Sequence, residues 1–406
     1  MNRLRLCLLL LSASTSTLTG CDQTVGRQST VLSVKDLIQS CQKAVDGKDI
    51  NLAAKDCGFT EQWLERIDPD SVQHAEVLEK LGNLFAGSNA KAAETFYQKA
   101  LEIHEKQNNQ DNKQDNLRIK LASVLTVEGK WADADLVLKK VLKSIETEKG
   151  AESLEVADIL NRLGIVQLRQ QLLTDAEQSF TRALAIREKN PSFSGNILGE
   201  TYNNLGFLYQ SMGKNQEADM AYRKAIFNQE TAKDGSSSQL YDSLSNLATL
   251  LQKQGKASEA EVYFKKLLVV SEKVFGNESA QYAQGLNSLG MLGLGANNFA
   301  IAEQLFNASL SIREKKLGVS HILTAEAANN LAVAMANQGK RTQAMLLMRR
   351  AAAISEMVLG NNDPLTQQRW QSLLMLDIAE SAKNNVSIAP YPQALVDAKN
   401  KRLRGN

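Results

Sequence analysis

Cys21 is the first residue whose type and place suggest chemistry. The chain has four cysteines, and this one follows the small residues Thr19 and Gly20 in the stretch LTGCDQ, Leu18–Gln23. An accessible thiol is open to covalent modification. The residues that come before it determine the compartment in which that modification would take place.

The first twenty residues have the layout of a secretory signal. Arg3 and Arg5 give a short basic start, Leu4–Leu11 is an apolar run, and residues 12–20 are small or polar. This order is typical of a signal peptide that is removed. The apolar run is too short to span a bilayer as a helix, which takes about 20 residues. We therefore expect residues 1–20 to direct export of the chain.

Residues Leu18 to Cys21 also resemble the bacterial lipobox, the end of a lipoprotein signal peptide. The resemblance implies that the Cys21 thiol carries diacylglycerol, that the chain is cut before Cys21, and that residues 21–32 form a lipidated tether. Two or three acyl chains anchor a protein firmly, because each buried methylene contributes about 0.8 kcal/mol. The protein would be anchored in the cell membrane and face the periplasm. Asp22 resembles an inner-membrane retention signal, and an outer-membrane location stays open.

Cys41 and Cys57 remain after the signal is removed, and two interpretations of them stay open. An exported chain meets an oxidising compartment, in which two cysteines can form a disulfide. Two helices packed as a hairpin would bring them together, but spacing alone does not establish the pairing. The other interpretation is that they are two small buried residues.

No group of residues has a spacing that indicates catalysis. The three histidines, His74, His104 and His321, do not pair at metal-ligand spacing on a helix. No glycine-rich phosphate loop follows a predicted strand, and no serine lies in a nucleophile elbow. We predict that the protein is not an enzyme, binds no cofactor or metal, and has no small-molecule substrate.

The charge balance gives no support for a nucleic-acid partner. The chain has 47 Lys and Arg and 45 Asp and Glu; residues 1–20 hold two arginines and no acid, which leaves 45 of each in the mature chain. A nucleic-acid-binding protein has a basic excess or a basic stripe. We therefore expect no nucleic acid among the partners.

A single pattern recurs along most of the chain. Segments such as LNRLGIVQ (from Leu160) and LSNLATLL (from Leu244) align on a central leucine that a glycine or alanine follows. After a first step of 40 residues, the central leucines recur every 42: Leu81, Leu121, Leu163, Leu205, Leu247, Leu289 and Leu331. Six copies also have an alanine twelve residues after the small residue and a bulky residue four residues later. In the first copy this alanine, Ala93, comes one residue early, which predicts a shorter turn.

This periodicity predicts stacked pairs of helices. Each unit reads as two helices joined by a turn, in which a glycine supplies the left-handed cap. The small residues let the two helices cross closely, and the bulky ones fill the space between neighbouring units. One unit cannot bury its own apolar face, so the units must stack.

The pattern resembles the tetratricopeptide repeat over residues 71–359. The 42-residue period resembles the kinesin-light-chain subtype, as in AIREKN (from Ala185) and EKVFGNES (from Glu272). The resemblance implies an all-α fold, a right-handed superhelical solenoid of antiparallel helix pairs in seven repeats. We expect residues 33–70 to be an N-terminal helical cap, residues 364–383 a C-terminal capping helix, and residues 384–406 a flexible tail.

The same resemblance implies a peptide groove lined by asparagines. In tetratricopeptide proteins the residues two and three positions before the small residue project into a groove. These positions hold Asn161, Asn203, Asn204, Asn246, Asn287, Asn329 and Asn330. An asparagine has both a donor and an acceptor, so it can pair with a ligand's backbone. The alternative is that these side chains hydrogen-bond adjacent helices.

A row of acids lies three residues before the asparagine positions. Its members are Glu76, Asp158, Glu200, Asp242 and Glu326. The clamp with which some tetratricopeptide proteins grip a carboxylate terminus needs lysines on this face instead. The row therefore favours a neutral or basic ligand, although part of it also fits solvated acids near helix starts.

Two functional classes follow for a non-enzymatic lipoprotein. Tetratricopeptide proteins generally act as adaptors. The resemblance therefore implies a membrane-anchored scaffold that binds protein or extended-peptide partners in its groove. The alternative is a structural assembly factor for an envelope complex, similar to the repeat lipoproteins that help to build pili, secretins or exopolysaccharide exporters.

Overall fold

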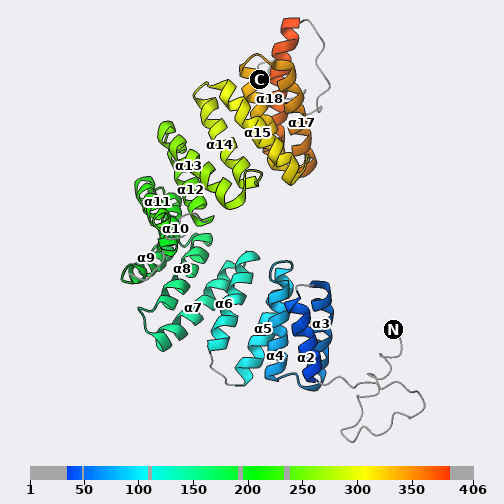
Figure 1. Cartoon of the computed structure of the whole chain (residues 1–406), viewed down its shortest axis with the longest axis vertical. Helices are drawn as coiled ribbons and strands as arrows, with labels where there is room; N and C mark the ends of the chain where they lie inside the picture. Colours follow the sequence, from blue (N-terminus) through cyan, green and yellow to red (C-terminus); the bar gives the residue numbers. More distant parts are fainter. Residues whose placement is uncertain (1–33, 48–49, 108–111, 191–194, 233–237, 385–406) are drawn as a thin grey trace, which may run out of the picture. The chain divides into compact units, whose positions relative to one another are not determined.

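The computed structural model describes residues 34–47, 50–107, 112–190, 195–232 and 238–384 (Figure 1). The expected signal peptide, Cys21, Asp22, the tether and the tail beyond residue 384 lie outside these ranges. The described residues form helices joined by turns and contain no strand. This is the all-α solenoid that the repeat predicts. None of the described helices is both long and apolar enough to cross a bilayer.

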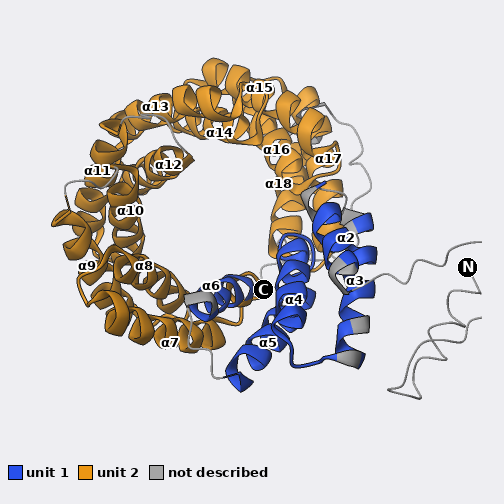
Figure 2. Cartoon of the chain, turned by 60° about the horizontal axis from the view of Figure 1, so that its bottom comes forward, with its two compact units in different colours: residues 1–124 blue, residues 125–406 orange. Residues whose placement is uncertain are grey.

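The chain divides into two compact units, residues 1–124 and 125–406 (Figure 2). The first holds α2 (Val34–Asp46), α3 (Ile50–Ile67), α4 (Val72–Phe85), α5 (Ala90–Lys106) and most of α6 (Asn112–Val127). The second holds α7 (Trp131–Lys149), α8 (Leu154–Arg169), α9 (Leu173–Glu188), α10 (Gly195–Ser211), α11 (Asn215–Glu230), α12 (Ser238–Lys253), α13 (Ala257–Phe275), α14 (Ala280–Gly295), α15 (Phe299–Leu317), α16 (Ile322–Asn337), α17 (Arg341–Leu359) and α18 (Pro364–Asn384).

Two layers of helices make up the second unit. Each helix from α7 to α18 packs against the next one along the chain. The even-numbered helices carry the central leucines, and in Figure 2 α10, α12 and α14 lie on the inner side of the unit, with α11, α13 and α15 on its outer side. The leucines from Leu163 to Leu331 are all buried, as their period predicts.

Each glycine that follows a central leucine makes room for the bulky residue of the same helix pair. A Cβ atom added to Gly164, Gly206 or Gly290 would lie 2.6 Å from a ring carbon of Phe180, Tyr222 or Phe306, respectively. Phe180 also packs in one cluster with Leu205 of the following pair. The bulky residues therefore fill the space between neighbouring units, as expected, but this is not their only role. They also set how closely the two helices of one unit approach.

The turns between paired helices repeat one backbone conformation. Gly213 and Gly255 have φ angles of 73° and 75°, and Gln171, at the equivalent place, has 64°. A residue in this left-handed region ends the first helix, and the chain then turns into the second. Glycine adopts this conformation without strain, whereas glutamine does so at a cost.

The first repeat differs from the later ones, but not in the expected way. Its turn spans residues 86–89, whereas the turn between α8 and α9 spans residues 170–172. The turn is therefore not shorter. Instead, α4 ends closer to its central leucine, Leu81, than α8 does to Leu163.

Helices also lie at the two ends of the repeats. The pair α2 and α3 precedes the first repeat, and α18 packs against α17. Leu373, one period after Leu331, is buried in α18, and so is Leu374. A leucine in place of the usual glycine or alanine leaves no room for a bulky residue from a following helix.

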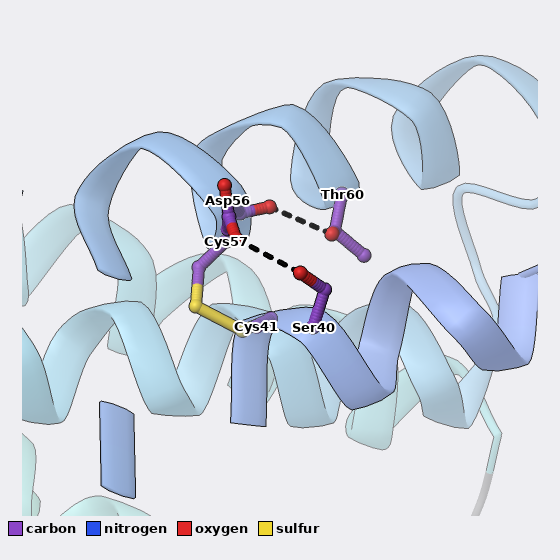
Figure 3. The surroundings of a disulfide bond; sticks show 5 residues. All are labelled: Ser40, Cys41, Asp56, Cys57 and Thr60. Atoms are coloured by element: carbon purple, nitrogen blue, oxygen red, sulfur yellow. Dashed lines mark hydrogen bonds between the residues drawn. A yellow bond between two sulfur atoms is a disulfide. The ribbon is translucent and has the colours of Figure 1, made fainter. Parts of the chain in front are cut away.

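Cys41 of α2 and Cys57 of α3 form a disulfide in the structure (Figure 3), with their Cα atoms 4.5 Å apart. Both residues are fully buried and belong to a small core with Leu64, Val77 and Leu81. Beside the bond, Ser40 Oγ donates a hydrogen bond to Asp56 Oδ2 at 2.8 Å. The disulfide and this core join the end helices to α4.

We predict that replacing both cysteines by alanine loosens α2 and α3. Closing a loop of this length contributes about 3 kcal/mol through the unfolded state. Amide hydrogen exchange in these helices should accelerate roughly 100-fold, since about 1.4 kcal/mol corresponds to a factor of ten. The amides of α14 to α17 serve as the internal control and should not change. Native protein with two free thiols, or unchanged protection of α2, would contradict the expectation.

Candidate functional site

The predicted site residues fall into two groups, of which the structure describes one. Cys21 lies outside the described residues, so its acylation stays a prediction. The cysteines of the disulfide and all seven asparagines are described.

Two of the three histidines have structural roles. His74 is buried, and its Nδ1 lies 2.8 Å from the Pro69 carbonyl oxygen. His321 caps α16, where its Nδ1 accepts a hydrogen bond from the Leu323 amide at 3.1 Å. Within the described ranges, no three His, Cys, Asp or Glu residues gather closely enough to hold a metal ion.

The asparagines form a ladder between neighbouring even-numbered helices. Asn204 Nδ2 donates to Asn161 Oδ1 at 3.1 Å, and Asn246 Nδ2 donates to Asn203 Oδ1 at 3.0 Å. Asn330 Nδ2 donates to Asn287 Oδ1, also at 3.0 Å. In each case the donor lies 43 residues after the acceptor. For these six residues, the alternative of pairing with adjacent helices therefore describes what the structure shows.

The ladder leaves part of the amide groups available. Asn203 Nδ2 and Asn246 Oδ1 have no hydrogen-bond partner among the described residues, and both side chains are half-buried. Asn329 does not join the ladder, and its buried Oδ1 has no partner in the described part of the chain. The asparagines thus tie the inner layer together and still offer some donors and acceptors.

The acidic row is mostly paired. Asp158 accepts from Arg187 Nη2 at 2.6 Å, Glu200 accepts from Asn161 Nδ2 at 3.1 Å, and Glu326 lies 3.3 Å from Arg313 Nη1. Glu76 is exposed near the start of α4, so the interpretation as a solvated acid fits it. Asp242 has no ion-pair partner in the described chain, and partial desolvation raises the pKa of its carboxyl.

An apolar row runs beside the asparagines, and sequence reasoning missed it. Phe207 of α10 is 41 % exposed and Met291 of α14 is 39 % exposed. Each comes four residues after an asparagine of the ladder, Asn203 or Asn287, and residues at this spacing share one helix face. Both come directly after the small residue of their repeat and lie 84 residues, or two periods, apart, with Thr249 at the place between them.

Two pockets of about 340 Å³ lie in the second unit. Glu303, Gln338 and Lys340 line one of them, and these residues already pair with one another, with Lys340 Nζ 2.6 Å from Glu303. The other pocket lies between α10, α11 and α12. Its lining residues are Glu200, Asn203, Asn204, Gln229, Ser238, Gln239 and Asp242. Here the asparagine ladder and the acidic row meet at an open place.

Comparisons with known proteins agree with this architecture. Family models described as tetratricopeptide repeat match residues 115–189, 199–226, 239–315 and 324–365. No curated protein matches the sequence.

Solved structures resemble the chain in fold. A signal transduction ATPase with numerous domains and a tetratricopeptide repeat sensor, from Pyrococcus horikoshii, aligns with a TM-score of 0.56 and 13 % identity, over 80 % of this chain and 50 % of that one. The apo form of the quorum sensor NprR from B. thuringiensis aligns with a TM-score of 0.53 and 14 % identity, over 79 % of this chain and 87 % of that one. At these identities the likeness concerns the fold alone.

The repeated helix pairs, the ring placed on a glycine and the matching family models lead to one assignment. Such solenoids generally act as protein-binding scaffolds, because stacked helices expose an extended surface. The chain belongs to the tetratricopeptide repeat family.

Proposed function

We propose that the protein is a lipid-anchored adaptor of the bacterial cell envelope, which binds extended segments of partner proteins along its even-numbered helices. The anchor is the acylated Cys21, and the membrane that holds it is the inner one, as Asp22 suggests. The protein performs no catalysis of its own.

One observation carries the binding proposal: the inner layer combines a ladder of asparagines with two exposed apolar side chains one helical turn from it, Phe207 and Met291. Phe207 and Met291 offer apolar contact, and Asn203, one helical turn before Phe207, and Asn246 of α12 each keep one unpaired amide group. An extended segment presents backbone donors and acceptors along its length and side chains at intervals. Amides can pair with such a backbone, and the apolar residues can select among side chains.

The odd-numbered helices provide the competing surface. Met220 and Phe227 of α11 are more exposed than Phe207, but the asparagine ladder runs along the even-numbered helices. Exposed apolar residues scattered over a surface are normal and do not by themselves mark an interface. The inner face therefore has the better support.

We predict that Cys21→Ser abolishes lipid attachment and cleavage before residue 21. The thiol is the acceptor of the diacylglycerol, and a hydroxyl does not replace it in this chemistry. Labelling of cells with a clickable fatty acid, followed by fractionation, measures both effects. Cys7→Ser is the matched control and should be labelled like the natural chain. A Cys21→Ser protein that is still cut before residue 21 and still bound to the membrane would refute the anchor.

We predict that a photoreactive amino acid at Phe207 captures a partner in intact cells, and that one at Phe227 does not. The two positions lie on neighbouring helices of opposite layers, which makes Phe227 a matched control. Mass spectrometry of the adduct identifies the partner.

Capture from Phe227 alone would contradict the proposal that partners bind along the even-numbered helices. It would place the interface on the odd-numbered helices instead. A captured protein present in a fixed, stoichiometric membrane complex would favour the assembly-factor function. Capture of several proteins in exchangeable amounts would favour the adaptor.

A further inference from the structure

One position near the end of the odd-numbered helices differs from unit to unit. With the 42-residue period it holds Arg187, Gln229, Ser271, Arg313 and Ser355. The two arginines are almost completely buried, with exposures of 3 % and 1 %. A buried guanidinium requires hydrogen-bond partners, so its surroundings show which groups a cation needs at this place.

The two arginines share two of their three partner offsets along the chain, and the third differs by one residue. Arg187 donates to Asp158 at 2.6 Å, 29 residues before it, and to the Ile197 carbonyl and Thr201, 10 and 14 residues after it. Arg313 donates to Gln284 at 2.6 Å, to the Leu323 carbonyl at 2.6 Å and to Glu326 at 3.3 Å, at offsets of 29, 10 and 13. The repeat therefore surrounds both arginines with a similar set of polar groups, which includes one carboxylate and one backbone carbonyl in each case.

Gln229 occupies the same position, but the cation is missing. Counting the same offsets leads to Glu200, Gln239, Asp242 and Ser243. Three of these, together with Gln229, line the pocket of about 340 Å³ between α10, α11 and α12. A glutamine is shorter than an arginine and carries no charge, so it cannot neutralise the two carboxylates.

Glu200, Asn203 and Asn204 of this pocket have hydrogen-bond partners, whereas Gln229 and the neighbouring Ser243 do not. Gln229 is 1 % exposed, and neither its Nε2 nor its Oε1 has a partner among the described residues. Ser243 Oγ is buried and also lacks a described partner. A buried polar group without a partner costs about 1–3 kcal/mol, so the place favours a ligand that supplies donors and acceptors.

The remaining two positions are filled by other means. Ser271 Oγ donates to the Leu268 carbonyl at 2.9 Å. Ser355 accepts a hydrogen bond from Arg369 of α18, so a guanidinium is present there too. Among these five positions, Gln229 is the one at which both polar side-chain atoms are left without a described partner.

We propose that this pocket receives the guanidinium group of an arginine from the partner protein, in the place that Arg187 and Arg313 fill in their own units. This inference rests on the proposed function, because it names the chemistry of the bound segment. A guanidinium presents five donors in a plane, which suits carboxylates, an amide oxygen and a hydroxyl gathered around one cavity. The ammonium of a lysine is a compact point charge and fits this arrangement less well.

The first test uses N-acetyl-argininamide as the probe and the full mature chain. We expect saturable shifts of the Gln229 side-chain amide signal in an NMR titration. N-acetyl-citrullinamide, which is neutral and of similar shape, and N-acetyl-lysinamide should each bind at least about tenfold more weakly. Equal binding of all three probes, or no shift of the Gln229 signal, would overturn the inference.

Two variants locate the site. Gln229→Arg should place an internal guanidinium in the pocket and abolish probe binding, measured as the heat of titration because this variant lacks the Gln229 amide signal. Asp242→Asn should weaken binding roughly tenfold. Gln216→Arg is the control, because it adds the same charge at an exposed position of the same helix α11 and should leave binding unchanged. Asp242 is exposed, so its substitution should not prevent folding. If the probe binds to both pocket variants as tightly as to the natural chain, it does not bind in this pocket.

Crosslinking at Phe207 then separates this inference from the proposed function. If Gln229→Arg removes the captured partner and Gln216→Arg does not, the arginine belongs to that partner. If capture persists in Gln229→Arg, the adaptor function stands and the partner does not use the pocket. If Phe207 captures nothing even in the natural chain, the proposed function itself fails, whatever the probe does.

Discussion

The contact between an aromatic ring and a glycine determines the geometry on which the rest of the second unit depends. In three helix pairs, a Cβ atom on the glycine would lie 2.6 Å from the ring, which no real packing allows. Gly164, Gly206 and Gly290 therefore let the rings of Phe180, Tyr222 and Phe306 lie directly on the helix backbone. The two helices of each of these three pairs share one close approach. Because of this repetition, asparagines 43 residues apart meet at 3.0–3.1 Å in three places.

Because the units repeat, the same position can be compared from one junction between units to the next. The comparison is most informative at the junction whose residue differs from the others. Arg187 and Arg313 show that the fold can bury a cation between neighbouring pairs when carboxylate, amide and carbonyl oxygens surround it. Gln229 retains the surroundings without the cation. Natural proteins seldom leave buried polar groups unpaired without a reason. A pocket of this kind, next to the apolar Phe207 and the asparagine ladder, links the architecture of the solenoid to the binding of a partner.

The sequence was sufficient to predict the architecture, because the helix pairs repeat with the same 42-residue period as the sequence. The burial of Leu163 to Leu331 and the close packing at Gly206 follow from a 42-residue spacing of leucine and small residues. The partners of the asparagines could not be predicted in the same way. Their spacing of 43 joins two different positions of the repeat, and only the placement of neighbouring helices shows that they meet. The apolar row of Phe207 and Met291 had the right period but was overlooked beside the more conspicuous asparagines. The pairing of Cys41 with Cys57 required the hairpin of α2 and α3.

A double-mutant cycle on α14 and α15 tests most directly whether the ring on the glycine holds each unit in place. Hydrogen exchange of these two helices gives the free energy of local opening for Gly290→Ala, Phe306→Leu and the double variant. Gly290→Ala should destabilise the pair by about 1–3 kcal/mol through overpacking, and the loss should shrink clearly once Phe306 is leucine. Gly295→Ala is the control, because a Cβ atom there meets nothing within 4 Å. Effects of Gly290→Ala and Phe306→Leu that add to within about 0.5 kcal/mol would contradict the account.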